Sequence, residues 1–220
     1  MSPRIRFDQE LTELHKDVEE MSHIVECEYD KLFEALKVKD RVALERIEKN
    51  DRNVNDMQHK IEAQCLNLIT RQQPIARDLR MVSAALKVVT DIERIGDNIA
   101  DMAELFIRLD MIEVTEYSIH IQGMVEVTKE LLHKAVNVFV NRDMQEAEQV
   151  IKDDDVVDAL FNKTKEDIIQ HLKLEKGDED ACIDILMVAK YLERIADHAT
   201  NIAEWEIFQE TGTVDNVMLL

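Results

Sequence analysis

The chain has 220 residues and a formal net charge of −20, from 47 acidic and 27 basic side chains. Such a charge disfavours nucleic acid or anionic lipid as a partner, because phosphate-rich surfaces bind clustered Lys and Arg. Four Gly, two Pro and 5% aromatic residues leave few turn signals for a many-stranded fold, whereas the abundant Leu, Ala, Glu, Lys and Met favour helices. We therefore expect an all-α protein built from long helices.

Cysteine usage and hydropathy indicate the compartment. Cys27, Cys65 and Cys182 are widely spaced and contain no C-x-x-C pair, which is typical of reduced thiols in a cytoplasm and predicts no thiolate metal site. No apolar run approaches the roughly 18 residues that cross a bilayer, and the first residues lack a signal-peptide core. We expect a soluble cytoplasmic protein without membrane insertion.

In the first half of the chain, apolar residues recur every three or four positions in three stretches. They predict a helix over 7–38, a second from the turn at Asp40 up to Pro74, and a third from Pro74 to about Asp110. Asp40 is suited to cap the second helix, and a proline ends one helix and starts the next well. Gly96 falls inside the third helix, where glycine costs about 1 kcal/mol relative to alanine. We therefore expect a close approach by a neighbouring helix at that position.

The same plan recurs in the second half, with helices expected over 114–141, from Asp143 onward and from Asp178 onward. The cap at Asp143 repeats the earlier one at an offset of 103 residues, which falls to 100 before the last helix because the connector is shorter. The chain is therefore predicted to be a tandem repeat of two three-helix bundles, with repeats at 1–111 and 112–220. No low-complexity linker separates them, so the six long helices should pack together.

An acidic motif, Glu-Arg-Ile-x-Asp, begins at Glu93 and again 100 residues later at Glu193. Because residues four apart share a helix face, each copy starts a polar stripe. The stripes contain Glu93, Asp97 and Asp101 in the first half, and Glu193, Asp197 and Asn201 in the second. Like charges at this spacing weaken a helix by a few tenths of a kcal/mol per pair, and oxygen-rich sites usually offset that with a cation. A single pair would indicate only a solvated face, but the matched repetition favours a shared function.

The middle helix of each half carries a second polar pair. Asp51 and Asn55 match Asp154 and Asp158 at an offset of 103 residues. Asp51 and Asp154 interrupt apolar seams, where a lone carboxylate costs several kcal/mol unless it is paired or ligated. We expect the two pairs of each half to converge into a carboxylate-rich site for a divalent or trivalent cation.

Other side chains beside these motifs are open to two interpretations. Arg94 and Arg194 either hold a carboxylate in place beside the metal or form ordinary surface ion pairs. His59 shares the stripe of the middle helix and His198 adjoins Asp197. Each histidine is either a ligand or, as is more common, a solvent-facing or hydrogen-bonded side chain.

Two Glu-x-x-His motifs, ending at His23 and His133, raise the alternative of a ferritin-like di-iron carboxylate protein. They lie 110 residues apart, out of register with the duplication, and would need a four-helix arrangement. A purely structural helical scaffold without metal is a further alternative. No nucleophile set, Gly-rich phosphate loop or dinucleotide fingerprint is readable, so we do not expect an enzyme.

These motifs together resemble the PhoU family of phosphate-signalling regulators. The resemblance lies in the stretch from Asp51 to Asn55, in Arg71-Gln72-Gln73-Pro74 and in the two Glu-Arg-Ile-x-Asp copies, and with the helix plan it covers nearly the whole chain. It implies bundles whose E(D)-x-x-x-D motifs bind multinuclear iron or zinc clusters. The metal-binding positions that it implies are Asp51, Glu93, Asp97, Asp101, Asp154, Asp158, Glu193 and Asp197, while Asn55 and Asn201 depart from the acidic pattern.

The resemblance also implies a function. It predicts a cytoplasmic, negatively acting regulator of phosphate homeostasis, which dampens phosphate uptake and the two-component response to phosphate starvation. The partners that it implies are the ATPase component of the phosphate ABC transporter and a sensor histidine kinase. It further implies a homodimer.

Overall fold

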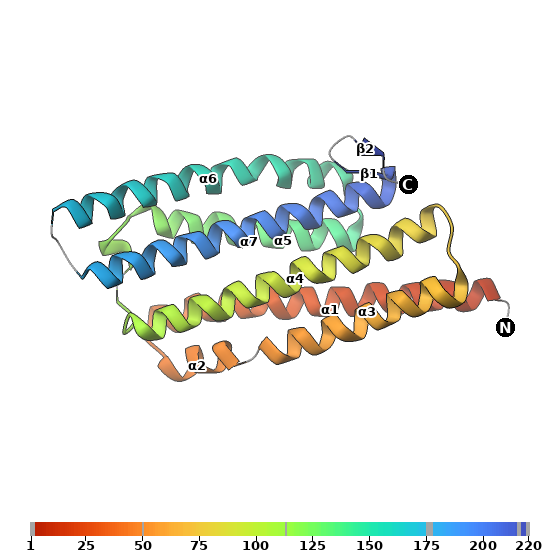
Figure 1. Cartoon of the computed structure of the whole chain (residues 1–220), viewed down its shortest axis with the longest axis horizontal. Coiled ribbons are helices and arrows are strands. Elements are labelled where there is room, and N and C mark those ends of the chain that lie inside the picture. The colour runs from red at the N-terminus through yellow and green to blue at the C-terminus, as the bar shows by residue number, and fades with distance from the viewer. Residues whose placement is uncertain (1–2, 50, 113, 175–177, 215–216, 219–220) are drawn as a thin grey trace.

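The computed structural model describes residues 3–49, 51–112, 114–174, 178–214 and 217–218. Nearly all of them are helical, which confirms the all-α prediction. Figure 1 shows two bundles of long helices lying side by side, with both chain termini at the same end. Among the described helices, none combines the length and the apolar character that crossing a bilayer requires.

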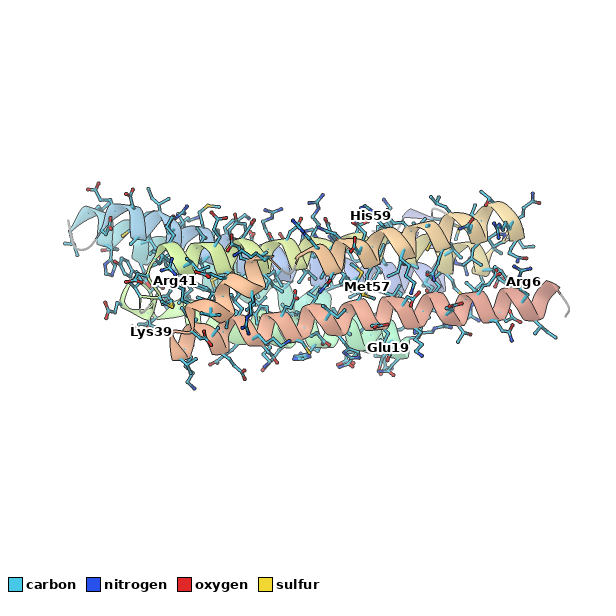
Figure 2. The ribbon with its side chains drawn as sticks, turned by 90° about the horizontal axis from the view of Figure 1, so that it is seen from below. Arg6, Glu19, Lys39, Arg41, Met57 and His59 are labelled. Atoms are coloured by element: carbon cyan, nitrogen blue, oxygen red, sulfur yellow. The ribbon has the colours of Figure 1, made fainter. Side chains whose placement is uncertain are left out.

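The first bundle contains α1 (Pro3–Val38), α2 (Arg41–Lys49), α3 (Asp51–Gln72) and α4 (Arg77–Arg108). Where one helix was predicted after Asp40, the structure gives two, α2 and α3, and the position between them lies outside the described residues. Helix α2 packs against α1 and α4, and Figure 2 shows it, with Arg41, at one end of the face formed by α1 and α3. The predicted cap is confirmed, since Asp40 Oδ1 accepts a hydrogen bond from Ala43 N at 3.0 Å.

The turn between α3 and α4 differs from the prediction. Pro74 was expected to open the third helix, but α4 begins three residues later, at Arg77. Gln73 and Ala76 adopt positive φ angles of 47° and 46°. This left-handed backbone reverses the chain direction before α4 can start.

The second bundle contains the 3₁₀ turn η1 (Val114–Glu116), α5 (His120–Asn141), α6 (Met144–Lys173) and α7 (Glu179–Thr211). Asp143 caps α6 by accepting hydrogen bonds from two backbone N–H groups, and Asp178 caps α7 in the same way with one. The helix predicted over 114–141 begins later than expected, at His120, because residues 114–116 form a 3₁₀ turn. Unlike its counterpart in the first bundle, α6 runs without a break.

A short antiparallel ladder follows α7. It consists of β1 (Thr213–Val214) and β2 (Val217–Met218), and the sequence pattern did not predict it. Gly212 ends α7 in the left-handed region, with φ of 80°, where glycine carries no Cβ penalty.

The predicted apolar seams form one contiguous core across the described part of both bundles. At Gly96 a Cβ atom would lie 3.3 Å from Val54 Cγ1, so the expected close approach is confirmed and the neighbour is α3. The equivalent Ala196 is fully buried. The small residue at Gly96 allows α3 to pack tightly onto α4 at the level of the first acidic motif.

The two bundles meet mainly along α4 and α7, which lie next to each other in the centre of Figure 1. The Arg108 guanidinium pairs with Asp184 near one end of this contact. Near the other end, Arg80 donates to the carbonyl oxygens of Gln209 and Glu210 in the last turns of α7. The bundles therefore pack together, as predicted, and polar contacts fix the register of the two helices.

Candidate functional site

The second bundle brings its four predicted acidic ligands into one electrostatic group. Asp154 and Asp158 lie on α6, and Glu193 and Asp197 lie on the neighbouring α7. Burial and, after it, the negative charges of Asp197 and Asp158 raise the pKa of Asp154 to about 6. Burial also raises the pKa of Asp197, with Glu193 adding to the effect. We call these four side chains the second acidic cluster.

A lysine already neutralises part of the second acidic cluster. The ammonium of Lys190 contacts the Glu193 carboxylate, and it also lies 5.4 Å from the ring centroid of Phe161 on α6. Its charge opposes the rise in the pKa of Asp197. Arg194, the residue that the sequence suggested for this role, is exposed and influences Tyr191 instead.

In the first bundle Arg94 forms ion pairs with both carboxylates of the acidic motif. Arg94 Nη1 lies 2.8 Å from Asp97 Oδ2, and Arg94 Nε lies 3.4 Å from Glu93 Oε2. Asn55 is half-buried on α3 and directly follows Val54, whose contact with Gly96 sets α3 against this turn of α4. The structure thus places Asn55 on a helix packed against the one that carries Glu93 and Asp97.

The side chain of Asp51 lies outside the described part of the chain. Its predicted role as a ligand therefore stays a prediction.

The structure places Asp101 and Asn201, the last members of the predicted stripes, between the two bundles. Asn201 Nδ2 donates to Asp91 Oδ1 at 3.0 Å, and Asp101 interacts with Tyr191, whose pKa is raised by burial and then by this carboxylate. These residues link α4 to α7. Sequence analysis missed Asp91 and Tyr191, although their offset of 100 residues equals that of the acidic motifs.

The two histidines considered as possible ligands, His59 and His198, are a solvent-facing and a hydrogen-bonded side chain, respectively. His198 Nδ1 donates to Asp91 Oδ1 at 2.9 Å, so it is a hydrogen-bonded side chain of the α4–α7 contact. His59 is 75% exposed, and its Nδ1 lies 3.8 Å from Glu62. Figure 2 places His59 on α3.

The two Glu-x-x-His motifs do not form the di-iron arrangement. Their glutamates, Glu20 and Glu130, are exposed. Instead, His23 Nδ1 and His133 Nδ1 both donate to the buried carboxylate of Glu26, at 2.8 and 2.6 Å. This contact, which we call the Glu26 clasp, joins α1 to α5 and thereby ties the bundles together along a second line.

The donor chemistry of the second acidic cluster suits a cation. Neighbouring carboxylates help to raise the pKa of Asp154 and of Asp197, so a positive charge among the four side chains would stabilise them, and oxygen ligands favour hard or borderline ions. Within the described part of the chain, no three His, Cys, Asp or Glu side chains are drawn close enough together to form a ready-made metal site. Metal binding would therefore require these carboxylates to move toward a common point.

These features define a class of protein: a duplicated bundle of long helices with acidic residues on the last helix of each copy and on the helix before it. The PhoU domain family matches this chain twice, over residues 18–106 and 121–205. The chain belongs to the PhoU family.

Curated relatives match over nearly the full length. The phosphate-specific transport system accessory protein PhoU homolog of Clostridium acetobutylicum is 34% identical over 207 residues, which are 94% of each chain. PhoU homolog 1 of Methanothermobacter thermautotrophicus is 32% identical over 210 residues, covering 95% of this chain and 96% of the relative.

Solved structures agree with the fold. The crystal structure of PhoU from Pseudomonas aeruginosa has a TM-score of 0.89 at 27% identity, with 94% of this chain and 100% of that chain covered. The phosphate transport system regulatory protein PhoU from Streptococcus pneumoniae has a TM-score of 0.87 at 25% identity, with 96% and 100% covered.

Proposed function

We propose that this protein is an accessory regulator of a phosphate-specific transport system and negatively modulates phosphate uptake and the phosphate-starvation response. One observation carries the proposal: relatives that bear this accessory role in their names match 94% and 95% of the chain at 34% and 32% identity. The duplicated PhoU domain supports it, because each matched segment spans most of one bundle in this chain. The proposed site of action is the cytoplasm.

The proposed mode of action is that of an adaptor and not of an enzyme. Long helices expose extended charged faces that suit contact with a partner protein, whereas nothing in the acidic motifs supplies a nucleophile with its base. The partners we propose are the transporter's ATPase component and a sensor histidine kinase, with the adaptor itself acting as a homodimer. These assignments come from the family resemblance.

We further propose that the acidic clusters bind transition metal, iron or zinc. In the second bundle Asp154, Asp158, Glu193 and Asp197 would hold it, and in the first bundle Glu93 and Asp97 would do so together with α3. The raised pKa values of Asp154 and Asp197, to which neighbouring carboxylates contribute, support this role in the second bundle. A bound ion would offset carboxylate repulsion and fasten the middle helix of each bundle to the last one.

The regulatory role is tested by deletion in the protein's own host. Alkaline phosphatase activity in phosphate-replete cells should rise when the gene is deleted and return to the parental level when the gene is restored. Unchanged activity in the deletion strain would refute the negative regulatory role.

Metal binding is tested by elemental analysis of protein purified from the same host. Glu193→Gln combined with Asp197→Asn should remove most of the metal held by the second bundle, because both changes keep shape and remove charge. The matched control is Glu34→Gln with Glu48→Gln, which removes two exposed charges on α1 and α2. Equal metal content in the two variants would refute the assignment.

A further inference from the structure

We propose that Lys190 is a built-in competitor for the second acidic cluster, holding Glu193 until a divalent cation displaces its ammonium. This inference rests on the proposed metal binding and concerns the second bundle. According to this proposal, Lys190 sets the affinity of the second bundle for its metal ion.

The position of Lys190 is fixed from two helices. Its ammonium contacts Glu193 three residues further along α7, and the Phe161 ring of α6 lies beneath it at 5.4 Å. The Glu193 side chain is only 14% exposed, whereas that of Lys190 is 43% exposed. The Glu193 carboxylate is therefore largely buried, and the Lys190 side chain reaches it from the solvent side.

Lys190 directly contacts one of the four carboxylates proposed as ligands, that of Glu193. A metal ion and this ammonium would compete for the same negative charge.

The first bundle has a different arrangement at the equivalent position. Thr90 lies 100 residues before Lys190, and its hydroxyl donates to the Leu86 carbonyl oxygen within α4. The carboxylates there contact the guanidinium of Arg94 instead. At this position the second bundle therefore has a lysine where the first has a threonine, and the carboxylates of the first bundle pair with an arginine of the acidic motif itself.

Lysine is suited to being displaced. Its ammonium is a compact, strongly hydrated point charge on a flexible four-carbon chain, whereas arginine forms a rigid fork. Because the Lys190 side chain is 43% exposed, it can rotate into water without repacking the core. A divalent ion with two or more carboxylate ligands gains more from Glu193 than one ammonium does, so it can expel the lysine at a modest cost.

The experiment compares Lys190→Met with Lys165→Met by Mn²⁺ titration, following the loss of the free-ion signal in electron paramagnetic resonance. Both variants are made in a Glu93→Gln, Asp97→Asn background, which removes carboxylates of the first bundle. Lys165 is a matched control because its ammonium also lies over Phe161, at 5.8 Å, but bonds to Asn162 Oδ1 and not to the acidic cluster. The two variants therefore change the net charge equally.

Lys190→Met should bind Mn²⁺ about two- to fivefold more tightly than Lys165→Met, the range expected on removing one partly exposed ion pair. Lys190→Arg keeps the charge, so its affinity should stay near that of the background protein. Thermal unfolding of each variant verifies that the fold is intact.

Equal Mn²⁺ affinities for Lys190→Met and Lys165→Met would overturn the competitor role alone, because net charge would then explain any change. Failure of the wild-type protein to bind Mn²⁺ would overturn the proposed metal function and the competitor role together. The two failures are distinguishable, since the first requires a protein that still binds the ion.

Discussion

Glu206 is a fully buried carboxyl on α7. Gln209 Nε2 donates to its two oxygens, at 3.1 and 3.4 Å. Burial raises the pKa of Glu206 to about 8, while the nearby charges of Arg142 and Arg77 act in the opposite direction and Glu210 raises it. The folded protein therefore keeps a proton on Glu206 at pH values where the unfolded chain has lost it. The stability from this group is complete below the ordinary glutamate pKa and is lost as the pH rises toward about 8.

Glu206→Gln should raise the unfolding temperature at pH 8 and change it little at pH 5. Glutamine has the shape of the protonated acid but does not have to lose a proton on unfolding. Thermal melts followed by circular dichroism at the two pH values measure the effect, with Glu48→Gln as an exposed control. An equal shift at both pH values would show that the proton on Glu206 is not the cause.

Individual site residues were predictable to the extent that they are repeated. Glu93, Asp97 and their partners in the last helix could be found because the same letters recur 100 residues apart. Lys190 could not be found in this way, since its counterpart is Thr90. Its role depends on which neighbouring helix lies beneath it, and that is set by tertiary packing.

At the scale of helices, the Glu26 clasp connects α1 to α5. The buried carboxylate of Glu26 receives one hydrogen bond from a histidine of each bundle. Removing one donor leaves a buried acceptor less well satisfied, which costs about 1–3 kcal/mol. The clasp is therefore a contact in which one side chain stabilises the packing of the two bundles.

His133→Ala should lower the free energy of unfolding by about 1–3 kcal/mol in urea titrations at neutral pH. His59→Ala is the control, because His59 is largely exposed on α3 and should change stability by less than about 0.5 kcal/mol. If the two variants are equally stable, the clasp does not stabilise the fold.

The presence of two helices, α2 and α3, where one was predicted shows why the helix pattern could not be predicted completely. Leu44, Ile47 and Val54 are buried in the first bundle, and Ala147, Val150 and Val157 are buried 103 residues later in the second. The same apolar spacing thus accompanies two helices, α2 and α3, in one bundle and the single α6 in the other. Periodicity reports which face is buried, but it does not report how many helices carry that face.

At the scale of the whole molecule, the two bundles share a core and should unfold together. The α4–α7 contact buries apolar side chains of both repeats in one contiguous cluster, and polar pairs such as Arg108 with Asp184 fix its register. Separating the bundles would expose much of that apolar surface to water. A tandem repeat was predictable from the duplicated motifs, but these contacts between copies were not.

Urea unfolding should therefore give one transition. Far-UV circular dichroism reports on helices of both bundles, and fluorescence of Trp205, the single tryptophan, reports on α7 in the second bundle. The two signals should change at the same urea concentration. Separate midpoints would show that the bundles are independent folding units.

The polar contacts along α4 and α7 occupy matching positions in the two repeats, yet their chemistry differs. Asp91 binds Asn201 and His198, while its counterpart Tyr191 meets Asp101. If the two bundles were separate copies of one repeat, the same residue would stand on both sides of the α4–α7 contact. Joining them in one polypeptide removes this constraint, so an acid on one copy can face an amide and an imidazole on the other, and each half is free to specialise.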